Sequence, residues 1–138
     1  VNFGIYNDKS KQVSHLCRNQ EYRIKIDIYS KIDIDKVSVA YRIDKLTGIV
    51  VCGTSSVSLN QLISLKSGQS KQVEFTFKCD LQNGPYVLGV AIAQHPDGCD
   101  FTILHSLLGG VGFEVAGNDH FQGIYNAKSK FIIAPESE

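Results

Sequence analysis

The segment His95-Pro96-Asp97-Gly98-Cys99-Asp100 holds the densest group of side chains that could do chemistry. Two carboxylates on a tight loop could contribute to a calcium site, because calcium takes oxygen ligands. Two carboxylates are too few to complete its coordination shell, however, and a Pro-Asp-Gly turn between strands normally leaves its carboxylates in solvent. We therefore favour a solvated turn over a metal site, and we predict no cofactor.

Six residues are candidate contacts for a sugar. A protein recognises a sugar by stacking an aromatic ring on the pyranose face and by hydrogen bonding the hydroxyl groups. The chain has no tryptophan, so tyrosine or phenylalanine must provide the ring. Each candidate taken alone also fits an ordinary surface or core position. The candidates are Tyr29, Arg42, Gln94, His95, Asp97 and His105.

The sequence pattern predicts where these candidates and three neighbouring residues lie. Tyr29 and Arg42 alternate with large apolar residues, so we expect them on an open sheet face. Phe121 and Tyr125 lie in a polar, glycine-bearing segment and are expected to be exposed. We expect two adjacent strands to bring five polar residues close together at one end: Gln94, His95, Asp97, Asp100 and His105.

Familiar catalytic motifs are missing from the sequence. The nearest match to a phosphate-binding loop, Ser67-Gly68-Gln69-Ser70-Lys71, has the wrong spacing, and there is no Gly-x-Ser-x-Gly elbow. The histidines are isolated from any nucleophile signature, which disfavours a hydrolytic triad. A glycosidase would use two paired carboxylates, and no particular pair stands out. We therefore expect a binding protein and not an enzyme.

Composition and charge indicate one domain with an uncharged ligand. The 138 residues suit a single domain, and 14 basic residues balance 14 acidic ones. Nucleic-acid binders usually carry a basic excess, so no nucleic-acid partner is expected. The longest apolar run, Ile49–Cys52, is far shorter than the roughly 20 residues of a membrane span. Because the chain starts in strand-like sequence and contains no methionine, we interpret residues 1–138 as one domain of a longer protein.

The four cysteines are widely separated and form no Cys-x-x-Cys pair. Zinc ligands usually come in close pairs, so this spacing disfavours a zinc site. Cys52 and Cys79 lie in apolar strand patterns and are expected to be buried. An even number of cysteines would allow two disulfides in an oxidising compartment, but we favour free thiols in the cytoplasm.

Apolar residues recur at every second position along most of the chain. The pattern is clear over 22–28, 37–43 and 73–79, and it predicts half-buried antiparallel strands. The segment Tyr86–Gln94 differs, because its second face is small and uncharged. Neighbouring side chains cover that face, or it forms the floor of a ligand groove. The small residues are Val87, Gly89, Ala91 and Ala93.

Turn residues separate the predicted strands. Glycine-bearing turns at 44–48, 82–85 and 95–98 suit hairpins, and only Leu59–Leu65 could form a short helix. The fold class predicted from this spacing is all-β: an antiparallel β-sandwich, immunoglobulin-like or jelly-roll. Further strands are expected at Val1–Tyr6, Gln12–Leu16, Ile49–Ser55, Phe101–Leu108, Val111–Ala116 and Phe131–Ala134.

The order of the motifs resembles one known family. Val39-Ala40-Tyr41-Arg42-Ile43-Asp44 is followed by Thr47-Gly48 and Cys52-Gly53-Thr54-Ser55. Then come Leu65-x-x-Gly68, Val73-x-Phe75-x-Phe77, Leu81-x-x-Gly84-x-Tyr86-x-Leu88-x-Val90, Phe113-x-Val115 and Phe121-x-Gly123. Over nearly its whole length the chain is similar to the C-terminal domain of Wzt, the nucleotide-binding subunit of bacterial ABC transporters that export O-antigen polysaccharide.

The resemblance implies a β-sandwich that binds the modified non-reducing end of a finished O-polysaccharide. In such a protein, binding would couple chain termination to export by the attached ATPase and its membrane-spanning partner, at the cytoplasmic face of the bacterial inner membrane. It also implies homodimers that exchange a terminal strand, with Phe131-Ile132-Ile133 as the donated strand. A second class stays open: a structural or protein-interaction sandwich, adhesin-like, whose edge strands add to a partner.

Overall fold

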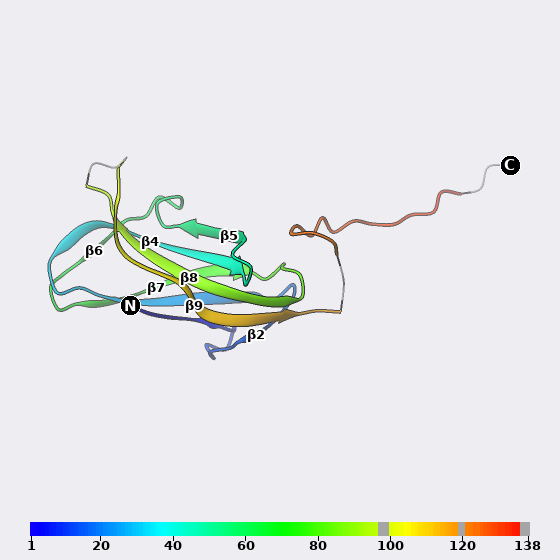
Figure 1. Cartoon of the computed structure of the whole chain (residues 1–138), viewed down its shortest axis with the longest axis horizontal. Helices are drawn as coiled ribbons and strands as arrows, with labels where there is room; N and C mark the ends of the chain where they lie inside the picture. Colours follow the sequence, from blue (N-terminus) through cyan, green and yellow to red (C-terminus); the bar gives the residue numbers. More distant parts are fainter. Residues whose placement is uncertain (97–99, 119–120, 136–138) are drawn as a thin grey trace.

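The computed structural model describes residues 1–96, 100–118 and 121–135, and in this part of the chain all regular structure is β-strand. Two sheets stack face to face, and the C-terminal segment extends away from them (Figure 1). The strands are β1 (Asn2–Tyr6), β2 (His15–Cys17), β3 (Glu21–Tyr29), β4 (Ile34–Lys45), β5 (Val50–Ser55), β6 (Ile63–Leu65), β7 (Ser70–Lys78), β8 (Gly84–Gln94) and β9 (Thr102–Ala116).

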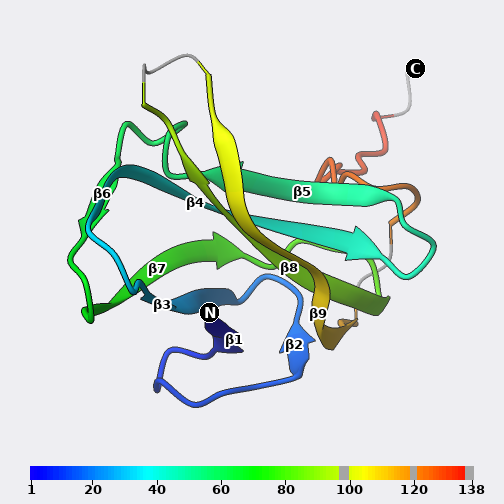
Figure 2. The ribbon, with the colours of Figure 1, turned by 60° about the vertical axis from the view of Figure 1, so that its left-hand side comes forward.

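The smaller sheet has three antiparallel strands in the order β1-β3-β7. The larger sheet has six strands, in the order β2-β9-β8-β4-β5 with β6 also paired to β4 (Figure 2). The short pairing of β2 with β9 is parallel, whereas the other pairings are antiparallel. The predicted all-β sandwich is therefore confirmed, with one short parallel pairing added.

The hydrophobic core lies between the two sheets and follows from the period-two pattern. In the smaller sheet, Ile24 of β3 pairs with Ile5 of β1 on one side and Phe75 of β7 on the other, and all three are buried. From the larger sheet, β4 and β8 send their alternate apolar residues into the same core. Each sheet therefore turns its apolar face inward and leaves its second face outside the sandwich.

Three details of the predicted secondary structure need correction. The short helix at Leu59–Leu65 is wrong: residues 56–60 form a turn, and Ile63–Leu65 form β6, which pairs with β4. The two strands predicted at 101–108 and 111–116 are one strand, β9, which continues through Gly109 at a φ of +68°. Phe131–Ala134 forms no strand within the single chain.

The described cysteines are free thiols in different environments. Cys79 is fully buried, as expected, while Cys17 and Cys52 are exposed. The predicted burial of Cys52 is wrong, because β5 is an edge strand of the larger sheet. Cys99 lies outside the described residues.

Alkaline pH is expected to destabilise the fold. Burial raises the pKa of the Cys79 thiol from 9.0 to about 11, and it also raises the pKa of Tyr22, Tyr41 and Tyr86. The unfolded chain loses these protons first, so the free energy of unfolding should fall as pH rises above about 9. For Cys79 the loss should reach about 2–3 kcal/mol.

Urea unfolding at several pH values would measure this effect. In the variant Cys79→Ala, the free energy of unfolding should fall less steeply across the same pH range, because the buried thiol is gone. An identical pH dependence in the two proteins would contradict the assignment to Cys79.

Candidate functional site

The outer face of the six-stranded sheet carries a groove of about 610 Å³, lined by residues of β4, β5, β8 and β9 and of the turn after β5. We call it the sheet-face groove. Its floor follows one row of the sheet, because Ala40 pairs with Ser55 and Ala91, and Ala91 pairs with Ser106. These four side chains are small, so the floor lies close to the backbone.

Two glycines extend this floor. Arg42 pairs with Gly53 on one side and Gly89 on the other. A Cβ atom on Gly89 would lie 2.9 Å from the carbonyl oxygen of Leu107, and one on Gly53 would overlap the carbonyl oxygen of Tyr41. Neither position can carry a side chain without moving the backbone, so the floor stays open along this row.

The face of β8 that carries small residues is therefore the outer face of the larger sheet. Of the two interpretations left open by the sequence, the groove floor applies to Gly89 and Ala91, which line the sheet-face groove. Ala93, the next residue on that face, is buried.

The walls of the sheet-face groove combine apolar and hydroxyl groups. Val50, Ile103 and Leu108 each expose more than half of their surface. Hydroxyl groups come from Ser55, Ser58 and Ser106. Apolar side chains next to hydroxyl groups suit a ligand that is itself part apolar and part hydroxylated.

Arg42 is the one charged residue among the described residues that line the sheet-face groove. Its Nε and Nη2 atoms donate hydrogen bonds to the two carboxylate oxygens of Asp44, both at 2.9 Å. The side chains are 40% and 12% exposed, respectively. This bidentate pair fixes the guanidinium group at the groove and balances its charge.

His95 lies on the same outer face, beyond the end of β8. Its Nε2 atom is 2.7 Å from the hydroxyl oxygen of Ser38, and its ring lies 5.6 Å from that of Phe101. His95 and Ser38 are both buried. In this chain the histidine therefore closes one end of the sheet face by packing against its neighbours.

The remaining predicted site residues lie elsewhere. Gln94 pairs with the core residue Val37, and its amide nitrogen donates to the carbonyl oxygen of Asp35 at 3.3 Å. His105 pairs with the core residue Ile92 and is exposed. Both therefore point to the inner side of the larger sheet, opposite Arg42. Asp97 lies outside the described residues.

Tyr29 belongs to the other sheet. It ends β3, pairs with Ser70 of β7 and is 56% exposed. The prediction that Tyr29 and Arg42 share one binding surface is wrong, because the outer faces of two stacked sheets point in opposite directions. As contacts for a sugar, Tyr29, Gln94, His95, Asp97 and His105 stay predictions.

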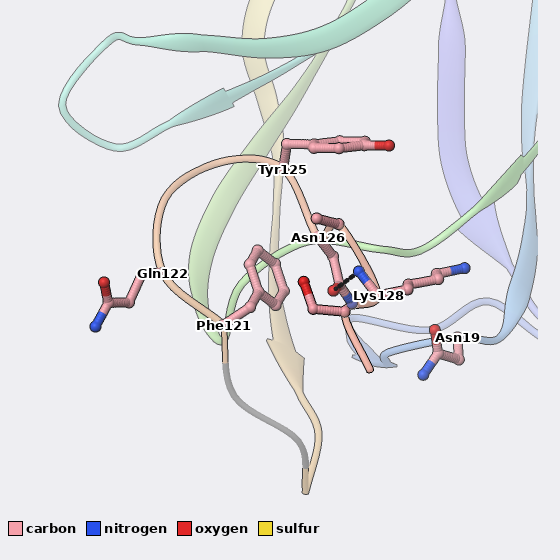
Figure 3. Close-up of a pocket in the computed structure, with 8 residues that line it drawn as sticks. Asn19, Phe121, Gln122, Tyr125, Asn126 and Lys128 are labelled. Atoms are coloured by element: carbon pink, nitrogen blue, oxygen red, sulfur yellow. Dashed lines mark hydrogen bonds between the residues drawn. The ribbon is translucent and has the colours of Figure 1, made fainter. Parts of the chain in front are cut away.

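A second hollow, of about 670 Å³, lies where the chain folds back after β9 (Figure 3). Its lining includes Asn19, Phe121, Gln122, Tyr125 and Lys128. The sequence predicts Phe121 and Tyr125 to be exposed. Tyr125 is 81% exposed, but Phe121 is only partly exposed because the Arg18 guanidinium group lies 5.1 Å from its ring centroid.

Three further contacts hold this segment to the sandwich. The side-chain amide of Gln82 donates to the carbonyl oxygen of Phe121 at 2.6 Å. Asn126 donates to one carboxylate oxygen of Asp80 at 3.0 Å, and Lys128 lies 3.6 Å from the other. We call these contacts, together with Arg18 and Phe121, the tail clasp.

In the described part of the chain, no three histidine, cysteine, aspartate or glutamate side chains gather closely enough to hold a metal ion. Within the same residues, no helix has the length and hydrophobicity of a membrane span.

One solved structure shares the fold over nearly the whole chain. A solved crystal structure, the C-terminal domain of Wzt, matches with a TM-score of 0.87 at 24% identity and covers 96% of this chain and 81% of that chain. The CARDB domain of a Pyrococcus furiosus protein, in complex with di-metal ions, reaches a TM-score of 0.47 at 14% identity over 83% of this chain and 88% of that chain. A Listeria innocua β-glucosidase in complex with gluconolactone reaches 0.43 at 14% identity over 84% of this chain and 16% of that chain. No curated protein sequence matches the chain.

The family model supplies the assignment. The model of the Wzt C-terminal domain matches residues 1–127, which is nearly the whole chain. This match agrees with the motif order of the sequence and with the two-sheet fold. The chain belongs to the Wzt C-terminal domain family, whose members are carbohydrate-binding domains associated with O-antigen transport by ABC transporters.

Proposed function

We propose that this chain binds the non-reducing end of an O-antigen polysaccharide in the sheet-face groove and catalyses no reaction there. The observation that carries the proposal is the groove itself. It has a floor of small residues, apolar walls and several hydroxyl groups, beside a fixed guanidinium group. A sugar ring offers the matching surface, with apolar C–H groups on its faces and hydroxyl groups around its edge.

The groove suggests how a terminal sugar would lie. One face of the ring would rest on Ala40 and Ala91, and its hydroxyl groups would bond to Ser55 and Ser106. The Arg42 guanidinium group has five N–H donors, and Asp44 occupies only those of Nε and Nη2. The remaining donors are available to the ligand.

Recognition of a finished end would link synthesis to export. In this proposal, residues 1–138 are one domain of a longer nucleotide-binding subunit at the cytoplasmic face of the inner membrane. A bound glycan end reports that the chain is complete, and the attached ATPase and its membrane-spanning partner then export it. The family's association with O-antigen transport supports this role.

We also propose a homodimer formed by strand exchange. Phe131, Ile132 and Ile133 are 89%, 83% and 80% exposed, which is unusual for three consecutive large apolar residues. Along β9, β2 pairs only with 114–116, and within the described residues no other strand occupies the rest of that edge. An unpaired strand edge is a template for a strand from a second copy.

Titration calorimetry of the domain with the O-polysaccharide of its own strain would test glycan binding. We expect saturable binding that is lost when the terminal sugar is removed enzymatically. Arg42→Ala should weaken binding about tenfold through lost hydrogen bonds. The matched control is Arg23→Ala on the outer face of β3, which should bind normally.

Two results would contradict the proposal. Equal binding by both arginine variants would move the site away from the sheet-face groove. Firm binding to a protein partner, with no binding to any cognate glycan, would favour the protein-interaction class.

A further inference from the structure

We infer that the tail hollow is a second glycan site, which binds sugar residues from the interior of the polysaccharide and not its end. The tail hollow is the space of about 670 Å³ between Asn19 and residues 121–129 (Figure 3). This inference rests on the proposed function, because it extends the bound glycan beyond the sheet-face groove. It follows from the free groups that line the hollow, from its fixed walls and from its place beside the groove.

Tyr125 provides a free aromatic ring. Its side chain lines the tail hollow and, at 81% exposed, it is the most exposed of the six tyrosines. Within the described residues, no other ring and no cation contacts it. A sugar can stack the C–H groups of its ring face on an exposed aromatic surface of this kind.

The polar groups of the lining are neutral or paired. The side chains of Asn19, Gln122 and Ser129 line the hollow and make no hydrogen bond within the described residues. Amide and hydroxyl groups both donate and accept, as the hydroxyl groups of a sugar do. Lys128 is the one charged residue of the described lining, and its ammonium group lies 3.6 Å from the carboxylate of Asp80. The hollow therefore suits a neutral, hydroxylated ligand better than a phosphate or a nucleic acid.

Other contacts fix the two walls of the tail hollow. In the tail clasp, the side chain of Asn126 donates to Asp80 at 3.0 Å and accepts the backbone N–H of Lys128 at 3.0 Å. The opposite wall is the turn between β2 and β3, where the backbone N–H of Asn19 donates to the carbonyl oxygen of Cys79 at 2.7 Å. The hollow is thus formed before a ligand arrives, and its volume lies within the roughly 300–1,000 Å³ of small-ligand sites.

The turn between β4 and β5 connects the tail hollow with the sheet-face groove. Gln82, which donates to the carbonyl oxygen of Phe121, lines a small hollow together with Thr47 of this turn. Val50, just after the turn, lines the groove. Both views show the orange tail segment beside the end of the sheet where β4 turns into β5 (Figures 1 and 2). The repeats behind a bound glycan end can therefore cross the turn and reach the tail hollow.

This linkage makes a weak contact useful. One ring and three polar groups bind a free sugar weakly, so removal of the terminal sugar still abolishes measurable binding. Once the end is held in the groove, the following repeats meet the tail hollow at a high effective concentration. The hollow then adds affinity only for a glycan long enough to occupy both sites.

Titration calorimetry with two oligosaccharides tests the inference. Both carry the natural non-reducing end of the strain's O-polysaccharide, one as a single repeat unit and one followed by several repeats. We expect the natural chain to bind the longer one about tenfold more tightly. In Tyr125→Ala this advantage should disappear, while binding of the single repeat stays unchanged.

Two further variants make the test independent of the tail. Asn19→Gly removes an amide from the opposite wall, and glycine accepts the φ of +70° found there, so this variant should also lose the advantage. The matched control is Ile124→Ala, an exposed neighbour of Tyr125 outside the described lining, which should keep it. Light scattering and urea unfolding confirm that the mass and the fold are unchanged.

The possible failures are distinct. Equal affinity of the natural chain for the two oligosaccharides, or a length advantage that survives in Tyr125→Ala or Asn19→Gly, would overturn the inference and leave the proposed function in place. Absence of binding to either oligosaccharide would instead overturn the proposed function.

Discussion

Replacing Ala91 by leucine is expected to abolish glycan binding while the sandwich stays folded. Ala91 lies in the centre of the groove floor, between Ala40 and Ser106, and its side chain points out of the sandwich. A leucine there would fill the space proposed for the sugar ring. Because branched and bulky side chains are well accepted in strands, the larger residue should cost the fold little. Affinity should fall by at least about 100-fold, as steric exclusion removes several contacts at once.

Titration calorimetry measures the loss, and circular dichroism with urea unfolding confirms that the variant is folded. The matched control is Thr76→Leu, another small outward residue, on β7 of the other sheet. It should bind the polysaccharide normally. Retained affinity in Ala91→Leu would show that the ligand binds elsewhere, with the outer face around Tyr29 as the next surface to test.

Removal of residues 131–138 is expected to convert a dimer into a monomer. The exposed stretch Phe131–Ile133 makes no strand pairing within its own chain, so its loss should leave both sheets intact. In the proposed dimer the same stretch pairs with a partner and buries its three large side chains. Its removal should weaken dimerisation by at least about 100-fold, since several buried apolar side chains are lost together.

Light scattering after size-exclusion chromatography gives the mass of each form. A point variant supports the result: Ile132→Asp should also give a monomer, whereas Ile32→Asp, at another exposed isoleucine, should not. A dimer that survives the truncation would exclude strand exchange through this segment. A natural chain that is monomeric at all concentrations would exclude the dimer itself.

Much of the fold could be predicted from the sequence, because apolar residues at every second position indicate which face of a strand is buried. The alternation around Ile24, Val39 and Phe75 correctly identifies three strands and their inward faces. The pattern is ambiguous in short segments. Leu59–Leu65 is too short to distinguish a helical turn from a strand, and its pairing with β4 decides the outcome.

The site could be predicted only in part, because periodicity tells which face of a strand a residue occupies but not which sheet the strand joins. Arg42 and Tyr29 have the same pattern, yet β4 and β3 belong to different sheets. The contributions of Ser55 and Ile103 were missed because they depend on the lateral order β5-β4-β8-β9. One signal was present: a glycine inside a strand often marks a close backbone approach, and Gly53 is such a residue.

The tail clasp has an entropic consequence for the proposed dimer. Ordering a free segment costs about 1–2 kcal/mol of backbone entropy per residue, and a long loose arm would meet that cost when it found its partner. Here Phe121, Asn126 and Lys128 are already tied to their own sandwich before any second copy arrives. In the proposed dimer, residues up to Lys128 would therefore add little to this cost, so the exchanged arm would already be partly positioned for association in the single chain.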